Sequence, residues 1–137
     1  ARFGVLEFDG RDKETLQEAM TLTRYWRDQG LDLLSVSMGF STPDASIPWG
    51  TAFLAPIAAR VRRETGVPVA SAWGIDSPVV ANQTVVDEQL DLVMVGRAHL
   101  KNPHWSYQAA LALHKDRPSW VLPAPYAHWL ERYSVSE

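Results

Sequence analysis

Two periods of apolar residues alternate along this chain and predict a strand followed by a helix, four times over. Short apolar runs rich in β-branched residues indicate strands, whereas apolar positions three and four residues apart indicate amphipathic helices. Residues 117–137 show no clear periodicity. The predicted strands span residues 2–8, 31–37, 67–72 and 90–95, and the predicted helices span about 12–29, about 54–66, a segment that begins at 77–78, and 102–113.

Local signals mark the ends of several predicted helices. Asp12 is expected to be the N-cap of the first helix, because a short carboxylate there accepts hydrogen bonds from free N–H groups. Gly30 and Gly66 are expected to end the first two helices, since glycine readily adopts the left-handed conformation found at helix C-termini. Ser77-Pro78 and Asn102-Pro103 each predict a capped helix start with proline in the first turn.

Alternating strands and helices predict an α/β fold with a parallel sheet and right-handed crossovers. Two architectures suit a chain of 137 residues: a small doubly wound sheet of the flavodoxin type, and half of an eight-stranded (β/α)8 barrel. Periodicity does not separate them, and both place ligands at the carboxyl ends of the strands. The length supports one core, so residues 1–137 are expected to form a single unit with a tail at 117–137.

The run from Leu90 to Ala98 is the most informative segment for function. Its apolar part predicts a strand that is buried on both faces and belongs to a parallel sheet. Gly96 would then let a ligand approach the backbone closely, and Arg97 adds a permanent cation with several donors. Such a strand end is typical of a phosphate site, although a tight turn followed by a surface arginine explains the same dipeptide.

Composition excludes several classes of function. A net charge of -3 argues against a nucleic-acid partner, and no apolar run is long enough to span a membrane. The absence of cysteine excludes disulfides and thiolate metal sites, no metal-ligand spacing is present, and a cytoplasmic location is expected. Because the chain opens with Ala1 inside a predicted strand, we expect a fragment or a processed piece.

Five segments carry a specific pattern in a fixed order: residues 1–12 (ARFGVLEFDGRD), 31–37 (LDLLSVS), 71–74 (SAWG), 95–100 (VGRAHL) and 123–133 (PAPYAHWLERY). Together they resemble the Old Yellow Enzyme family, and more narrowly the xenobiotic reductase A branch of its thermophilic-like class. The likeness extends over essentially the whole chain. Gly-Arg alone is a weak signal, whereas the ordered set is specific.

The resemblance implies an FMN-dependent ene reductase that takes hydride from NADPH or NADH and reduces an activated alkene such as an enone. It implies that this chain is the C-terminal half, strands five to eight, of a (β/α)8 TIM barrel, followed by the tail. In the family, the substrate-holding histidine pair and the proton-donating tyrosine belong to the first half, so no catalytic residue is assigned here. The N-terminal half of the barrel is therefore an expected partner, because a half-barrel exposes two sheet edges.

The same resemblance implies the cofactor-binding residues. An arginine in the first strand faces the N1/O2 side of the flavin, where reduction builds up negative charge that a guanidinium stabilises. The loops after the third and fourth strands hold the FMN phosphate through backbone amides and one arginine. The alternative for the first-strand arginine is a simple ion pair with a carboxylate. The cofactor-binding residues implied are Arg2, Ala72, Trp73, Gly74, Gly96 and Arg97.

The resemblance also implies a substrate pocket. Trp73 is expected to shape the cavity beside the flavin, although it could be a core aromatic. In the family the C-terminal tail crosses a dimer interface, so Trp129 and, less strongly, Arg132 are expected to wall a neighbour's pocket in a homo-oligomer. The alternative is a tail packed on its own barrel.

A second class of function stays open on sequence grounds. The chain could be a non-catalytic flavin- or phosphate-binding half-barrel that associates with itself. Turnover by this polypeptide alone, or only after addition of an N-terminal half, separates the two hypotheses.

Overall fold

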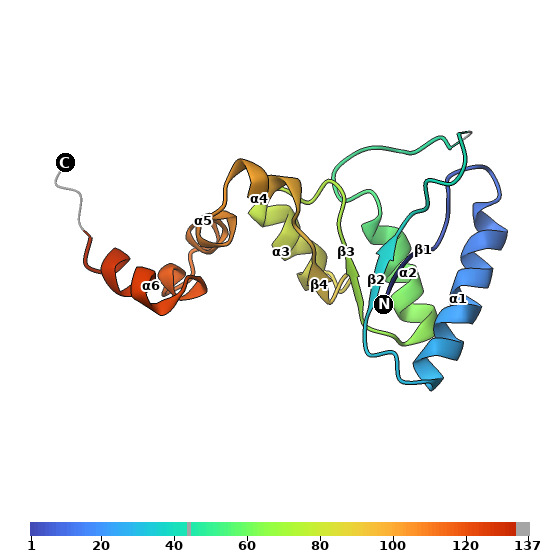
Figure 1. The fold of residues 1–137 in the computed structure, drawn as a ribbon, viewed down its shortest axis with the longest axis horizontal. Coiled ribbons are helices and arrows are strands. Elements are labelled where there is room, and N and C mark those ends of the chain that lie inside the picture. Colours follow the sequence, from blue (N-terminus) through green and yellow to red (C-terminus); the bar gives the residue numbers. More distant parts are fainter. Residues whose placement is uncertain (44, 134–137) are drawn as a thin grey trace.

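The computed structural model describes residues 1–43 and 45–133 and has a mixed α/β fold (Figure 1). The strands are β1 (Arg2–Gly4), β2 (Leu34–Ser37), β3 (Val69–Ser71) and β4 (Leu92–Val93). The helices are α1 (Asp12–Asp28), α2 (Ala55–Thr65), α3 (Pro78–Val86), α4 (Arg97–Lys101), α5 (Trp105–Ala112), the 3-10 helix η1 (Pro118–Val121) and α6 (Ala124–Leu130).

The four strands form one parallel sheet in the order β1-β2-β3-β4, so each strand pairs with the next one along the chain. A doubly wound sheet reverses its strand order at a switch point, whereas a barrel adds each new strand beside the last. The observed order contains no reversal and is compatible with part of an α/β barrel.

The two faces of the sheet differ in character. Leu34, Val36 and Val69 are almost fully buried and belong to one apolar cluster with side chains of the first three helices. The strand register places Arg2, Ser35 and Ala70 in one row that continues to Leu92 in β4. The helices therefore cover one face, and the other face carries smaller and more polar side chains. The helical residues of the cluster include Leu16, Met20, Ala58, Val61 and Ala81.

All four strands are shorter than the sequence predicts: β2 begins at Leu34 rather than at residue 31, β3 spans Val69–Ser71 rather than 67–72, and β1 and β4 differ most. The prediction of residues 2–8 is wrong beyond Gly4, because β2 ends at Ser37 and leaves the rest of the segment without a regular partner. There Phe8 takes a positive φ of 59°. The prediction of residues 90–95 is likewise too long, because β3 offers β4 only a short partner and no described strand pairs with its other edge.

The prediction that this last strand is buried on both faces is also wrong. Leu92 is 55% exposed, since it lies in the row on the face that the helices do not cover. Val93, on the other face, packs against the core. This exposed apolar side chain, at the end of its row on the edge strand, indicates that the face not covered by helices is open in this chain.

The signals for helix ends gave mixed results. Gly66 (φ 71°) follows α2 in the left-handed conformation, and Ser77 with Pro78 begins α3, as predicted. Asp12 as N-cap is wrong: Arg11 occupies that position, and the Asp12 carboxylate instead accepts hydrogen bonds from the backbone N–H groups of Phe8 (2.7 Å) and Glu7 (3.3 Å). It therefore fixes the preceding loop rather than the helix.

The C-terminal third departs further from expectation. Gly96, which follows β4 by three residues, leads directly into α4. The helix α5 begins at Trp105 rather than at Asn102, whose side chain accepts a hydrogen bond from the His104 N–H at 3.0 Å. The tail contains η1 and α6 despite its lack of periodicity. It extends away from the sheet rather than packing on it (Figure 1). No helix in the described part of the chain has the length and apolar character needed to cross a membrane.

Candidate functional site

The carboxyl ends of β3 and β4 lead into two neighbouring loops. The Met94 N–H donates to the Ser71 carbonyl oxygen at 2.9 Å and carries the strand pairing up to these loops. Just beyond, the guanidinium carbon of Arg97 lies 5.9 Å from the ring centroid of Trp73, within the range of a cation–π interaction. The structure thus brings together the two segments that were expected to form a phosphate site.

The turn after β3 has an unusual backbone. Trp73 and Gly74 both have positive φ values, 73° and 67°. A Cβ at Gly74 would overlap the carbonyl oxygen of Gly50, so only glycine allows this close approach. The Ala52 N–H donates to the Gly74 carbonyl oxygen at 3.2 Å. This turn is therefore tied to the end of the long loop between β2 and α2.

Five aromatic rings meet at this edge of the sheet. The ring centroids of Phe40 and Trp49 each lie 5.6 Å from that of Trp73. Trp49 continues to Phe53 at 5.5 Å, and Phe53 to Phe8 at 6.0 Å. We call these five residues the aromatic cluster. Sequence reasoning assigned a role only to Trp73 among these five residues, because nothing local shows which rings of a long loop contact a distant strand end.

Gly96 and Arg97 have the properties that an anion site needs. Nothing lies within 4 Å of a Cβ placed on Gly96, so the backbone there is open to a ligand. The first N–H groups of α4, at Arg97 and Ala98, have no acceptor within the helix. Arg97 is exposed, and among the described residues no carboxylate lies within 4.0 Å of its guanidinium.

Arg2 stands at the far side of the sheet from β4. Its guanidinium donates to the Ser37 hydroxyl at 3.4 Å, so it reaches toward the carboxyl end of β2. In residues 1–43 and 45–133 it has no carboxylate partner, and the alternative of a simple ion pair is not observed. The guanidinium is thus available at the edge where a ligand would bind.

The structure does not bring the tail residues to this edge. Trp129 lies on α6 and is highly exposed. Arg132 bonds within the tail, donating to the His128 carbonyl oxygen at 2.9 Å. In Figure 1, α6 lies well away from β3, and α3, α4 and α5 lie between them. The alternative of a tail packed on its own sheet is therefore not observed.

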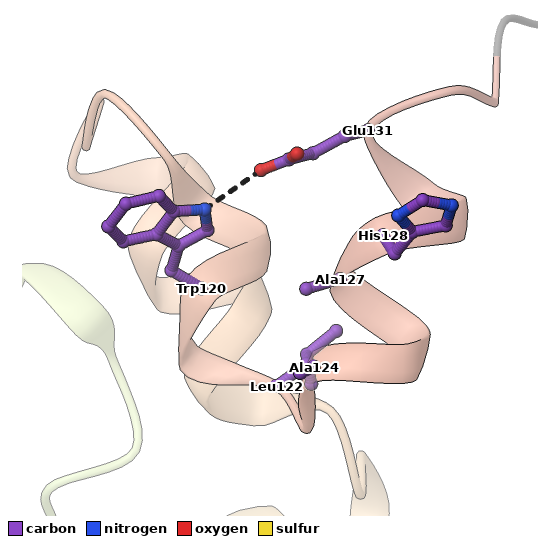
Figure 2. Close-up of a pocket in the computed structure, with 6 residues that line it drawn as sticks. All are labelled: Trp120, Leu122, Ala124, Ala127, His128 and Glu131. Carbon is purple, nitrogen blue, oxygen red and sulfur yellow. Dashed lines mark hydrogen bonds between the residues drawn. The ribbon is translucent and has the colours of Figure 1, made fainter.

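The tail has a pocket of its own. Figure 2 shows the Trp120 indole and the Glu131 carboxylate spanning it, joined by a hydrogen bond of 2.9 Å. Glu131 also accepts a hydrogen bond from the Ser119 hydroxyl at 3.1 Å, so the carboxylate holds α6 against η1. The pocket has a volume of about 380 Å³ and is lined by Trp120, Leu122, Ala124, Ala127, His128 and Glu131.

Two aspartates have lowered pKa values. The side-chain hydrogen bond from Arg11 lowers the pKa of Asp9. Burial alone would raise the pKa of Asp91, but hydrogen bonds from the Arg62 side chain and the Val69 N–H outweigh it and hold the pKa below its ordinary value. Asp91 precedes β4, at the opposite end of the strand from Arg97, and its contacts are structural. The described residues contain no group of three or more His, Asp or Glu placed to hold a metal ion.

Comparison with known proteins gives three informative relatives. The chain is 34% identical over 98 residues to an NADPH dehydrogenase of Halalkalibacterium halodurans, an alignment that covers 72% of this chain and 29% of the relative. It is 34% identical over 102 residues to an NADPH dehydrogenase of Geobacillus thermodenitrificans, covering 74% and 30%. A third NADPH dehydrogenase, from Geobacillus sp. (strain WCH70), is 31% identical over 99 residues, covering 72% and 29%.

The matched region spans about 29–30% of the length of these curated relatives. No protein-family profile matches the chain. The similarity is thus to one part of proteins named NADPH dehydrogenase.

Proposed function

We propose that this chain belongs to the Old Yellow Enzyme family and forms part of an FMN-dependent oxidoreductase that reduces activated alkenes, such as enones, with NADPH or NADH. The observation that carries the proposal is the pairing of Arg97 with Trp73 at the carboxyl ends of two adjacent parallel strands. The similarity to NADPH dehydrogenases supports the reaction class.

The fold supports the placement of the chain as strands five to eight of a (β/α)8 barrel. Its strands follow one another in sequence order, and the face that lines the interior of a barrel is the one left open here. Leu92 lies exposed on that face. A further set of parallel strands, from an N-terminal half, would cover this surface and pair with the free edges of β1 and β4.

The residues present fit the phosphate of FMN. Gly96 leaves open space for a ligand, the first N–H groups of α4 follow it, and the guanidinium of Arg97 has no carboxylate partner among residues 1–43 and 45–133. The turn at Ala72, Trp73 and Gly74 borders the same space. Arg2 would face the N1/O2 side of the flavin ring, where a fixed positive charge favours the reduced state.

When bound, FMN would supply hydride transfer between the nicotinamide and the alkene. The residues of this chain bind and orient: Arg97 holds the phosphate, and Trp73 limits the space beside the ring. The proposed substrate-polarising and proton-donating groups lie in the N-terminal half. The exposed Trp129 and Arg132 would reach a neighbouring protomer through the tail.

A second function is favoured by the free sheet edges. Two copies of this chain could pair through β1 and β4 and bind a flavin or phosphate without catalysis. The two candidate functions predict complexes of different mass. A complex with a second polypeptide and FMN indicates an enzyme, whereas copies of this chain alone indicate a self-associated binding module.

The proposal is tested by titrating FMN into the complex of this chain with its N-terminal half, with and without Arg97→Ala. Loss of one charge-assisted hydrogen bond should weaken binding by about tenfold to a hundredfold. Lys101→Ala, which removes an exposed cation from the same helix, is the matched control and should leave the affinity unchanged. Equal FMN affinity of the Arg97→Ala variant and the unmodified protein would refute the phosphate site.

A further inference from the structure

The loop between β2 and α2 places a ring at each of its ends against the same indole. Phe40 stands just after β2, and Trp49 stands near the end of the loop. Their centroids each lie 5.6 Å from that of Trp73, at interplanar angles of 51° and 53°. With Arg97 also over the ring, three side chains define the position of Trp73.

Hydrogen bonds fix this loop to the segment that follows β1. The Ser46 N–H donates to the Phe8 carbonyl oxygen at 2.7 Å, and the Gly39 N–H to the Leu6 carbonyl oxygen at 2.9 Å. The Glu7 carboxylate accepts a hydrogen bond from the Ser41 hydroxyl at 2.5 Å. The rings are thus carried by a tethered segment rather than by a free loop.

Both rings are nevertheless exposed to solvent. Phe40 is 62% exposed and Trp49 is 60% exposed, so burial in the core does not account for their position. Large aromatic side chains that are fixed and exposed at a strand end present flat apolar surface to a ligand. The indole Nε1 of Trp73 is buried and has no hydrogen-bond partner in the described part of the chain, so its surroundings enclose that edge of the ring closely.

We propose that Trp49 is a positioning residue for substrate selection. Its indole holds the Trp73 ring in place, and together with Phe40 it forms an aromatic wall that limits the size of the alkene reaching the flavin. The proposal rests on the proposed function, because it takes the space beside Trp73 as the substrate pocket. Neither Trp49 nor Phe40 lies in a segment that was assigned to FMN binding.

The test compares Trp49→Ala and Trp49→Phe in the FMN-loaded complex of this chain with its N-terminal half. For Trp49→Ala we expect the ratio of kcat/KM between a bulky cyclic enone and a small acyclic enone to change by about tenfold, mainly through KM. Trp49→Phe retains a ring and should restore most of the discrimination. Tyr25→Ala removes an aromatic side chain of equal exposure (60%) from α1 and should leave the ratio unchanged.

A spectroscopic measurement separates the geometry from the activity. Two indoles at this distance give an exciton couplet in far-ultraviolet circular dichroism, which Trp49→Ala should abolish in the unloaded protein. Trp120→Ala removes an indole of similar exposure that stacks on Arg117 rather than on another indole, and it should leave the couplet intact.

The outcomes distinguish the two proposals. If the unmodified complex fails to bind FMN, the proposed function and this inference both fall. If FMN binds and the couplet is lost in Trp49→Ala while the kcat/KM ratio stays within about twofold of the unmodified ratio, only the role of Trp49 is refuted. A couplet that persists in Trp49→Ala overturns the inference at its geometric basis.

Discussion

Asp91 joins the start of β4 to β3 and to α2, and its removal gives a sharp test of the structure. Its carboxylate accepts hydrogen bonds from the Arg62 Nε at 2.9 and 3.1 Å and from the Val69 N–H at 2.8 Å. Its own N–H donates to the Val69 carbonyl oxygen at 3.0 Å. Since β4 pairs with β3 over only two residues, this contact fixes the register that leads to Gly96 and Arg97.

The expected cost of Asp91→Ala follows from these contacts. Val69 is fully buried, and leaving its N–H without an acceptor costs about 1–3 kcal/mol. The ion pair with Arg62 is about one-third exposed on both sides and adds about 0.2–1 kcal/mol. We therefore expect the free energy of unfolding to fall by about 2–3 kcal/mol. Asp91→Asn keeps an acceptor for Val69 and should cost about 1 kcal/mol.

The chain supplies its own control. Asp32 stands in a second Leu-Asp-Leu segment, before β2, and is exposed. Asp32→Ala should change the free energy of unfolding by less than about 0.5 kcal/mol. Urea unfolding followed by circular dichroism measures all three variants.

The pH dependence provides an independent check. The pKa of Asp91 is lowered in the folded state, so its contribution is complete above the ordinary aspartate value of about 3.9 and is lost as the pH falls through the folded pKa. The stability difference between the unmodified protein and Asp91→Asn should be constant near neutral pH and shrink in acid. Equal unfolding free energies for Asp91→Ala and Asp32→Ala at pH 7 would refute this reasoning.

The remaining predictions concern the proposed flavoprotein. Arg2→Ala should lower the flavin reduction potential by about 30 mV, which is equivalent to one charge-assisted hydrogen bond. Arg60→Ala, on the outer helix, should leave the potential unchanged, and spectroelectrochemical titration of the two variants measures the difference. Trp73→Ala should shift the preference between small and bulky enones by about tenfold while the melting temperature stays nearly constant, and a large loss of stability would instead identify a core aromatic. Trp129→Ala combined with Arg132→Ala should weaken self-association in analytical ultracentrifugation, and an unchanged sedimentation profile would exclude the tail as an interface.

Local signals in the sequence predicted much of the helical structure. The helices that end near Gly30 and Gly66, and the helix that begins at Ser77-Pro78, were located correctly. Helix ends depend on the conformational preferences and hydrogen bonds of a few neighbouring residues, which the sequence contains. Asp12 shows the limit of this reasoning, since its carboxylate found donors in the preceding loop instead.

Strand lengths were predicted less well. A strand exists only as far as its neighbour pairs with it, so the early end of β1 at Gly4 depends on where β2 ends, more than thirty residues away. The short β4 has the same cause. The residues for a phosphate site at Gly96 and Arg97 were identified from sequence and resemblance, and their role remains a prediction.

The sequence by itself determined the alternation of strands and helices, several helix ends, and the identity of the residues at the strand ends. Only the tertiary structure decided the order of the strands, which contains no reversal, and the meeting of Trp73 with Arg97, Phe40 and Trp49. It also separated Trp129 and Arg132 from that group. The physical reason is the distance along the chain over which each interaction acts. Helix ends depend on residues a few positions apart. A parallel sheet, in contrast, brings together loops that are separated along the chain by entire crossover helices.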